Sequence, residues 1–220
     1  MEGTYTQKQL EIPFSDEEHI GFRIEDAIDY LSLRFGIKFK TKDRRKLNPE
    51  ISITSLGKAL GGRALGQFCY NEILRTNIIK IDPELFQYNN LFLTDLLIGE
   101  EVSHMLHRYS NPAFYELYKR SDIKFRPALD FLIETVGHYG GLIYCNRNEG
   151  NIACLLGLLA DDEFIDSAYT MADMLYMEHG DKRLREVSKI KDAFSIWEFS
   201  QELPRAEDLR NSVVEKRIQS

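Results

Sequence analysis

The chain is organised around Gly99-Glu100-Glu101-Val102-Ser103-His104-Met105-Leu106-His107. At 3.6 residues per turn of helix, the side chains of Glu100, His104 and His107 lie within about 60° of one another. The side chain of Glu101 is rotated by one residue, about 100°, from that of Glu100 around the helix axis. Apolar residues fill most of the other positions between 91 and 108, so this helix is expected to be buried. Because buried carboxylates and imidazoles are costly unless they are paired or bound to a metal, this stripe is a candidate functional site.

A second segment, Phe131-Leu132-Ile133-Glu134-Thr135-Val136-Gly137-His138-Tyr139, repeats the pattern. Glu134 and His138 are four residues apart among apolar neighbours, so they share one helical face. The chain has 5 histidines, and three of them lie in these two segments. Metal binding explains this concentration, because two side chains at i and i+4 can meet one ion. The alternative is a buried hydrogen-bond network that joins the two helices, with Glu100 and His138 in one charged contact.

Composition excludes several functional classes. The 220 residues are 43% hydrophobic and 29% charged, as in soluble globular proteins. The net charge of -7 argues against a protein that binds duplex nucleic acid, which needs a basic face. No apolar run approaches the roughly eighteen residues of a membrane span, and residues 1–13 are polar and lack a signal segment. Three cysteines without Cys-x-x-Cys spacing indicate neither a disulfide framework nor a zinc finger. We therefore expect a cytoplasmic protein without nucleic-acid or membrane partners.

The order of elements predicts an α+β fold in a single domain, residues 1–220. A mixed lobe with a small sheet and the central helix would cover residues 16–108, a helical lobe 109–203 and a charged tail 204–220. Hydrophobic periodicity and turn residues predict strands over 37–40, 64–70 and 77–81, and helices over 16–35, 91–108, 112–120, 127–143, 150–159, 162–179 and 181–199. Gly99, Gly137, Gly140 and Gly141 would let the two Glu/His helices approach closely. The apolar spacing after residue 150 is attributed to packing, with no chemistry assigned there.

These features resemble the zincin metallopeptidases of the gluzincin type, in which a strand precedes a helix with His-Glu-x-x-His and a later helix supplies a glutamate. The corresponding parts here are Asn77–Ile81, Glu100-Glu101-Val102-Ser103-His104 and Glu134, so the resemblance covers residues 20 to 140. The chain departs from the family at position 100, where a glutamate replaces the first zinc-binding histidine. Four residues after the glutamate ligand, many gluzincins have an acid that orients that histidine, and this chain has His138. Compared with the gluzincin pattern, the acid and the histidine have exchanged places between positions 100 and 138.

The resemblance implies one divalent metal ion, held by His104 and Glu134 together with one or both of Glu100 and His138. In one arrangement Glu100 binds the ion and His138 orients it, and in the other His138 is itself a ligand. Zinc is the expected metal. Manganese or iron is the alternative, because oxygen-rich ligands favour those ions.

The resemblance also implies roles in catalysis. Glu101 would be the general base that takes a proton from the water attacking a peptide carbonyl. Tyr139 would polarise that carbonyl, with His107 and Tyr144 as alternatives. The strand Asn77–Ile81 would offer an open edge to an extended peptide.

Three functions are compatible with this pattern. The first is a metal-dependent hydrolase of peptidase type, with a peptide or protein substrate. The second is a zincin-like protein without catalysis that binds peptides or partner proteins. The third is a di-iron carboxylate protein, since Glu101-x-x-His104 is the spacing used in such helical bundles. That class needs a second Glu-x-x-His, whereas Glu134 and His138 are four residues apart.

Overall fold

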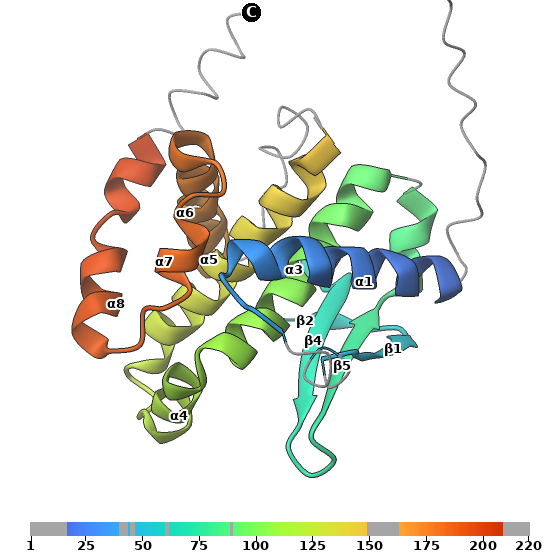
Figure 1. Ribbon diagram of the computed structural model, residues 1–220. Coiled ribbons are helices and arrows are strands. Elements are labelled where there is room, and N and C mark those ends of the chain that lie inside the picture. The colour runs from blue at the N-terminus through green and yellow to red at the C-terminus, as the bar shows by residue number, and fades with distance from the viewer. Residues whose placement is uncertain are drawn as a thin grey trace, which may run out of the picture.

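The computed structural model describes residues 17–39, 44, 47–59, 62–88, 90–148 and 163–208. The described part combines a small mixed sheet with a majority of helices, so the expected α+β class is confirmed (Figure 1). The helices are α1 (Glu17–Arg34), α3 (Leu91–Ser110), α4 (Pro112–Arg120), α5 (Arg126–Cys145), α6 (Glu163–His179), α7 (Leu184–Val187) and α8 (Ala193–Ser200), with 3-10 turns η1 (Pro83–Tyr88) and η2 (Asn146–Asn148). The strands are β1 (Glu50–Ile53), β2 (Lys58–Ala59), β3 (Gly62–Arg63), β4 (Gly66–Asn71) and β5 (Thr76–Ile81).

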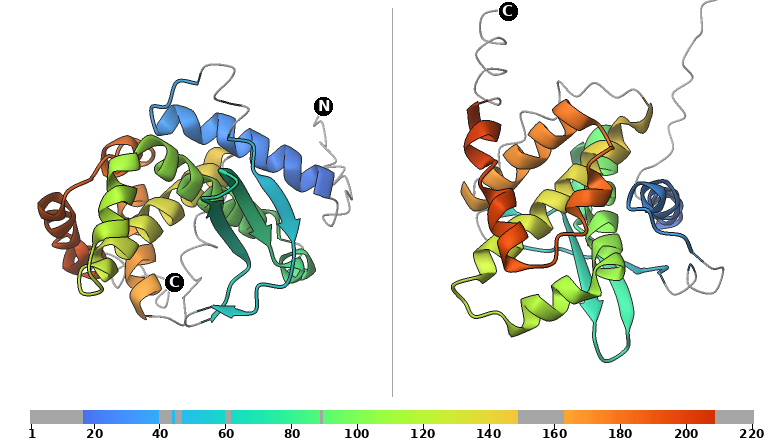
Figure 2. Two further views of the ribbon diagram at one scale, coloured as in Figure 1. Left: turned by 90° about the horizontal axis from the view of Figure 1, so that it is seen from below. Right: turned by 60° about the vertical axis from the view of Figure 1, so that its left-hand side comes forward.

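The main sheet has the strand order β1-β5-β4, with β1 parallel and β4 antiparallel to β5. Along β5, buried and partly buried residues alternate, and Ile79 and Ile81 point into the core as the period of two requires. The view from below in Figure 2 shows the sheet beside the helices. Because β5 is the central strand, the prediction of an open edge along residues 77–81 is wrong. In the described part, β4 and β1 form the margins of this sheet.

Two predicted elements differ from the structure, and a third lies outside the described residues. Residues 37–39 form no strand, and Ile37 and Phe39 instead pack against the hydrophobic core as an extended segment. The alternation of apolar and polar residues in this segment therefore reflects burial against the core and not pairing with another strand. The helix predicted over 181–199 is interrupted, since α7 ends at Val187 and α8 begins at Ala193. The helix predicted over 150–159 lies outside the described residues. The short strand β1 was not predicted.

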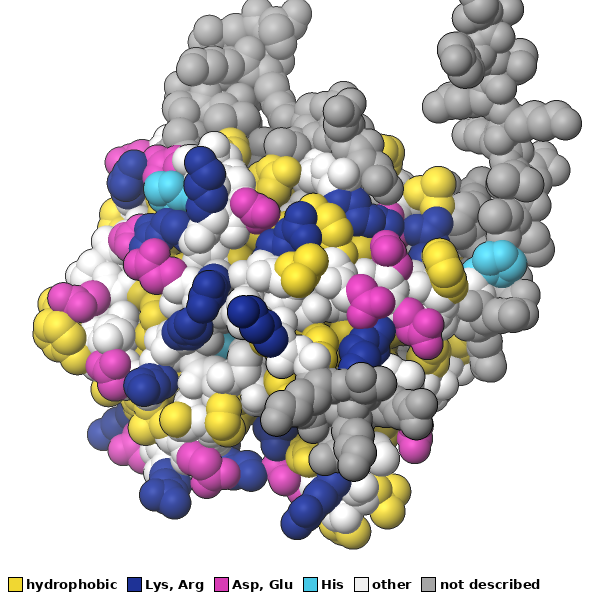
Figure 3. Space-filling model, in the orientation of Figure 1, with side chains coloured by type: hydrophobic (Ala, Val, Ile, Leu, Met, Phe, Trp, Pro, Cys, Tyr) yellow, Lys and Arg dark blue, Asp and Glu magenta, His cyan; other side chains and the backbone are white. Residues whose placement is uncertain are grey.

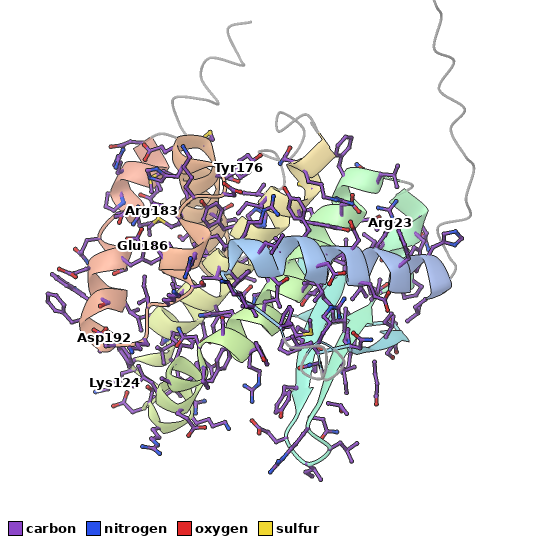
Figure 4. The ribbon with its side chains drawn as sticks, in the orientation of Figure 1. Arg23, Lys124, Tyr176, Arg183, Glu186 and Asp192 are labelled. Carbon is purple, nitrogen blue, oxygen red and sulfur yellow. The ribbon has the colours of Figure 1, made fainter. Side chains whose placement is uncertain are left out.

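Helix α3 lies at the centre of the described part and packs along α5, while α1 runs across α3 (Figure 1). Charged side chains hold α1 in place. Arg23 of α1, labelled in Figure 4, pairs with Asp95 of α3. Arg147 of η2 donates to the same carboxylate at 2.9 Å and lies 3.2 Å from Asp26 of α1. These ion pairs tie α1 and η2 to the N-terminal half of α3.

The surface is charged with both signs. On the face shown in Figure 3, Lys and Arg side chains are interspersed with Asp and Glu, and apolar side chains lie between them. Among the described helices, none has both the length and the apolar composition needed to cross a membrane.

Candidate metal centre

Helix α3 presents the predicted stripe to the interior. Its start is fixed by the side chain of Asn90, which accepts hydrogen bonds from two backbone N–H groups of the first turn. Its end is fixed by Asn111, whose side chain caps α4 immediately afterwards. Between these caps, Glu100, Glu101 and His104 are only 8%, 6% and 9% exposed. The helix therefore buries two carboxylates and an imidazole side by side, as the sequence predicted.

Glycines on α5 make room for the ligand side chains of α3. A Cβ atom at Gly137 would lie 2.3 Å from Cε1 and 2.5 Å from Nε2 of His104, so the imidazole rests directly on the backbone of α5. A Cβ atom at Gly140 would lie 1.8 Å from the Oγ of Ser103, and one at Gly141 would lie 2.7 Å from a carbonyl oxygen of α3. At each of these positions a side chain would force its neighbour to move. The predicted role of the glycines is confirmed.

Three side chains from the two helices converge on one point. Glu100, His104 and Glu134 each offer one ligand atom, and these atoms lie within 4.8 Å of one another. The Nε2 atom of His104 is 3.9 Å from Oε2 of Glu134. The side chain of Glu134 is 32% exposed, whereas that of His104 is 11% exposed, so the cluster opens to solvent on the side of Glu134.

His138 lies behind Glu100 and outside this group of three. Its Nδ1 atom is 3.5 Å from Oε2 of Glu100, and its Nε2 atom is 3.8 Å from Oδ1 of Asp173 on α6. The predicted contact between positions 100 and 138 is therefore present. Glu100 belongs to the group of three that could hold an ion, and His138 contacts Glu100 from outside that group. The assignment of His138 as a direct ligand is not supported by its position.

Tyr169 of α6 also contacts the cluster, and sequence reasoning missed it. Its hydroxyl group donates a hydrogen bond of 3.0 Å to Oε1 of Glu100. Its ring stacks on the imidazole of His138, with centroids 3.8 Å apart and planes 10° from parallel. The signal in the sequence is the pair Tyr169 and Asp173, two polar residues four apart on a helix whose other side chains are mostly apolar. That spacing is the same one that singled out Glu100 and His104.

The ionisation of the cluster follows from its burial and its neighbours. Burial alone would raise the pKa of Glu100, but the hydrogen bond to His138 and the charges of His138 and His104 outweigh it and lower the pKa. Burial raises the pKa of Glu134, because the charge of His104 compensates only part of the lost hydration. Glu100 is thus held as an anion, whereas Glu134 lacks a partner of comparable strength.

Glu101 lies beside the cluster and against the sheet. Burial and the nearby charges of Glu100 and Glu134 raise its pKa well above the ordinary value, although its carboxylate accepts a hydrogen bond from the backbone N–H of Phe68 on β4. A Cβ atom at Gly66 would lie 2.9 Å from Oε1 of Glu101, so the strand passes close to this carboxylate. Three carboxylates that share one buried region create a strong demand for a cation.

The residues proposed to polarise a carbonyl do not reach the cluster. Tyr139 is fully buried and its hydroxyl group donates to the carbonyl oxygen of Gly180, so its assignment as a catalytic residue is wrong. The physical reason is helical rotation, since consecutive residues are about 100° apart and Tyr139 cannot share the direction of His138. Tyr144 donates to Asp26 of α1 at 2.9 Å.

His107 is also directed away from the cluster. Its ring contacts Phe114 and Tyr115, with centroids 5.1 and 5.6 Å away. Burial, with the charge of His104 adding to it, lowers the pKa of His107 to about 3. The imidazole is therefore neutral near pH 7 and carries no charge toward the end of its helix.

Comparison with protein-family models, with curated proteins and with solved structures found no match for this chain. Its function must therefore be inferred from the geometry of the site.

Proposed function

We propose that the protein is a metal-dependent hydrolase of peptidase type with a zincin-like site. The observation that carries the proposal is the convergence of Glu100, His104 and Glu134, whose ligand atoms lie within 4.8 Å of one another beside Glu101. A structural network would neutralise its charges internally, but here three carboxylates share two imidazoles, His104 and His138. A bound cation would balance that charge.

The donor set fits a divalent ion. Two carboxylate oxygens and one imidazole nitrogen are ligands that zinc, manganese and iron accept. The Nε2 atom of His104 lies 3.9 Å from Oε2 of Glu134, so this is the nitrogen that the ring would offer to an ion. The ion would supply Lewis acidity to a substrate carbonyl or a water molecule. Two anionic ligands weaken that acidity relative to a site with two histidines, so we expect manganese or iron to compete with zinc.

Glu101 has the position and the environment of a general base. Its carboxylate lies next to the ligands but is not one of the three that converge. A general base works best when its pKa is close to the working pH, and the pKa of Glu101 is shifted upward in that direction. In the proposed reaction, Glu101 takes a proton from the attacking water and returns it to the amine that leaves. The hydrogen bond from the backbone N–H of Phe68 holds the carboxylate next to β4.

The strand beside Glu101 suggests how a peptide would bind. β4 ends the sheet on the side of α3 in the described part, and its backbone contacts Glu101. An extended peptide that pairs with this margin of β4 would pass over the cluster, in the mode of a strand added to a sheet. We therefore propose that the substrate peptide pairs with β4 and not with β5.

The competing functions make different demands on the same residues. A protein that only binds peptides would use the β4 margin without needing a metal or Glu101. A di-iron protein would need a second group of ligands, and the described residues hold a single cluster of three. We therefore keep the peptide-binding module as the alternative and set the di-iron protein aside.

Metal content is the first test. Protein purified without chelators or metal-affinity columns is analysed by mass spectrometry, as the parent, as His104→Ala and as His179→Ala, which removes a histidine outside the cluster. We expect close to one ion per chain in the parent and in His179→Ala and almost none in His104→Ala. A parent that takes up no zinc, manganese or iron would overturn the metal centre.

Turnover is the second test. A library of quenched fluorescent peptides is incubated with the parent and with Glu101→Gln, each loaded with the metal that the first test identifies. We expect Glu101→Gln to keep its metal and lose turnover by about 100-fold or more, as for removal of a general base. A metal-loaded parent that binds peptides but cleaves none would refute the hydrolase and support the binding module.

A further inference from the structure

Helix α6 contributes two polar side chains to the region around Glu100. Tyr169 and Asp173 are four residues apart, and both face α5 through their contacts with His138. Asp173 and His138 are only 6% and 3% exposed. Burial and the charges of Glu100 and Glu134 raise the pKa of Tyr169 well above 10, so its hydroxyl group stays a neutral donor. Asp173 and His138 are thus buried beside Glu100, with the half-buried Tyr169 stacked on His138.

Both oxygens of the Glu100 carboxylate are engaged by this group. Tyr169 donates to Oε1 at 3.0 Å, and the Nδ1 atom of His138 lies 3.5 Å from Oε2. The rings of Tyr169 and His138 stack and restrict one another's rotation. The Oδ1 atom of Asp173 lies 3.8 Å from Nε2 of His138. A carboxylate with one oxygen hydrogen-bonded to Tyr169 and the other facing an imidazole at 3.5 Å is restricted in its rotation about the terminal bond.

We propose that Tyr169, His138 and Asp173 are positioning residues that fix the carboxylate of Glu100 in one orientation before an ion arrives. This inference rests on the metal centre proposed above and extends it to α6. Glutamate is longer and more flexible than histidine, so a glutamate at position 100 loses more side-chain entropy on binding. Orienting contacts reduce that loss, and they typically contribute 10- to 100-fold to metal affinity. Helix α6, to which the sequence analysis assigned no chemistry, then completes the site.

The two outer residues would act on Glu100 differently. Tyr169 touches the carboxylate directly, so Tyr169→Phe frees Oε1 and leaves the ring stack with His138 in place. Asp173 acts through His138, so Asp173→Asn weakens the hold on the imidazole without touching Glu100. We expect the effect of Tyr169→Phe on metal affinity to be the larger of the two.

Cobalt binding tests the proposal, because Co²⁺ occupies sites of this type and its visible absorption reports the number and arrangement of ligands. The parent, Tyr169→Phe and Tyr118→Phe are titrated with Co²⁺, and affinity and absorption spectrum are recorded together. Tyr118→Phe is the matched control, because its hydroxyl group donates to Asp130 at 2.8 Å, which is also a tyrosine–carboxylate hydrogen bond. Chemical denaturation of the metal-free proteins measures the stability of each.

We expect Tyr169→Phe to lose about 10-fold in Co²⁺ affinity and to show an altered spectrum, because the freed carboxylate can bind through one or both oxygens. Tyr118→Phe should keep the affinity and spectrum of the parent, even where its stability falls as much. A Tyr169→Phe variant with the parent's affinity and spectrum would overturn the positioning role and leave the metal centre intact. A parent that binds no Co²⁺, Zn²⁺ or Mn²⁺ would instead overturn the metal centre and the positioning role together.

Discussion

Gly137→Ala is the sharpest structural test of the site, because it adds one methyl group under the imidazole of a ligand. The new Cβ atom would lie 2.3 Å from Cε1 of His104, while ordinary contacts begin at 3.4 Å. The ring must therefore move by about 1.1 Å, or the helices α3 and α5 must separate. Metal–ligand distances tolerate a change of only about 0.2 Å. We expect the variant to lose at least about 10-fold in affinity for its metal.

The effect on stability should be smaller than the effect on metal binding. Overpacking a core by one methyl group costs about 1–3 kcal/mol, and replacing a helical glycine by alanine returns about 0.5–1 kcal/mol. The net loss of about 0–2.5 kcal/mol leaves a folded protein, which guanidinium denaturation of the metal-free form would confirm. Isothermal titration with the metal then gives the affinity of the folded variant.

Gly99→Ala separates a displaced ligand from a loosened helix pair. A Cβ atom at Gly99 would lie 2.8 Å from the Cβ of Tyr144, so it strains the same crossing without meeting a ligand side chain. We expect a comparable loss of stability and an affinity within about threefold of the parent. Parent-like affinity in Gly137→Ala would refute the placement of His104 on α5. Equal losses in both variants would show that helix spacing, and not the imidazole, controls binding.

Three further variants probe the surroundings of the site. Since the pKa of His107 is about 3 in the folded state and about 6.5 when unfolded, only the unfolded chain takes up a proton between these values, and the free energy of unfolding falls by about 2 kcal/mol from pH 6.5 to 5. In denaturant titrations at pH 6.5 and 5, His107→Phe should not show this part of the fall in the free energy of unfolding. A pH dependence equal to that of the parent would contradict the burial of a neutral imidazole. Asp95→Asn leaves Arg147 with weaker pairing and should cost about 3 kcal/mol in the same assay; a cost below about 1 kcal/mol would show that the pairing is not stabilising. Gly66→Ala should displace the carboxylate of Glu101 and lower peptide turnover about 10-fold or more at full metal occupancy, whereas unchanged turnover would argue against Glu101 as the base.

The helices of the site could be predicted from sequence because local periodicity encodes them. A glutamate and a histidine four residues apart must share a face, and glycines at 137, 140 and 141 mark a close crossing whatever the rest of the fold is. The sheet could not be predicted in the same way. β1 has only four residues and no clean alternation, and it joins β5 through a parallel pairing across 28 positions of sequence, from Glu50 to Ile78. Such a pairing leaves little local signal.

The site residues that were missed belong to a helix far along the chain. The spacing of Tyr169 and Asp173 is a weak local signal, and the contact of Tyr169 with Glu100 depends on how α6 packs against α5. The role expected for Tyr139 came from the resemblance alone, and in the structure its hydroxyl group donates to the carbonyl oxygen of Gly180. The contact between Glu100 and His138 was predictable because it follows from two motifs whose spacing could be compared.

The exchange between positions 100 and 138 has an electrostatic consequence that the structure makes specific. Moving the carboxylate into the ligand position and the imidazole behind it keeps the contact, at 3.5 Å, but brings a negative charge closer to the ion. The hydrogen bond from Tyr169 and the nearby His138 draw charge density away from Glu100 and lower its pKa. A carboxylate weakened as a base in this way donates less charge to a metal than a free glutamate would. In the proposed metal centre, the contacts from α5 and α6 would therefore offset part of the extra charge that a glutamate brings to a position where the resemblance leads one to expect a histidine.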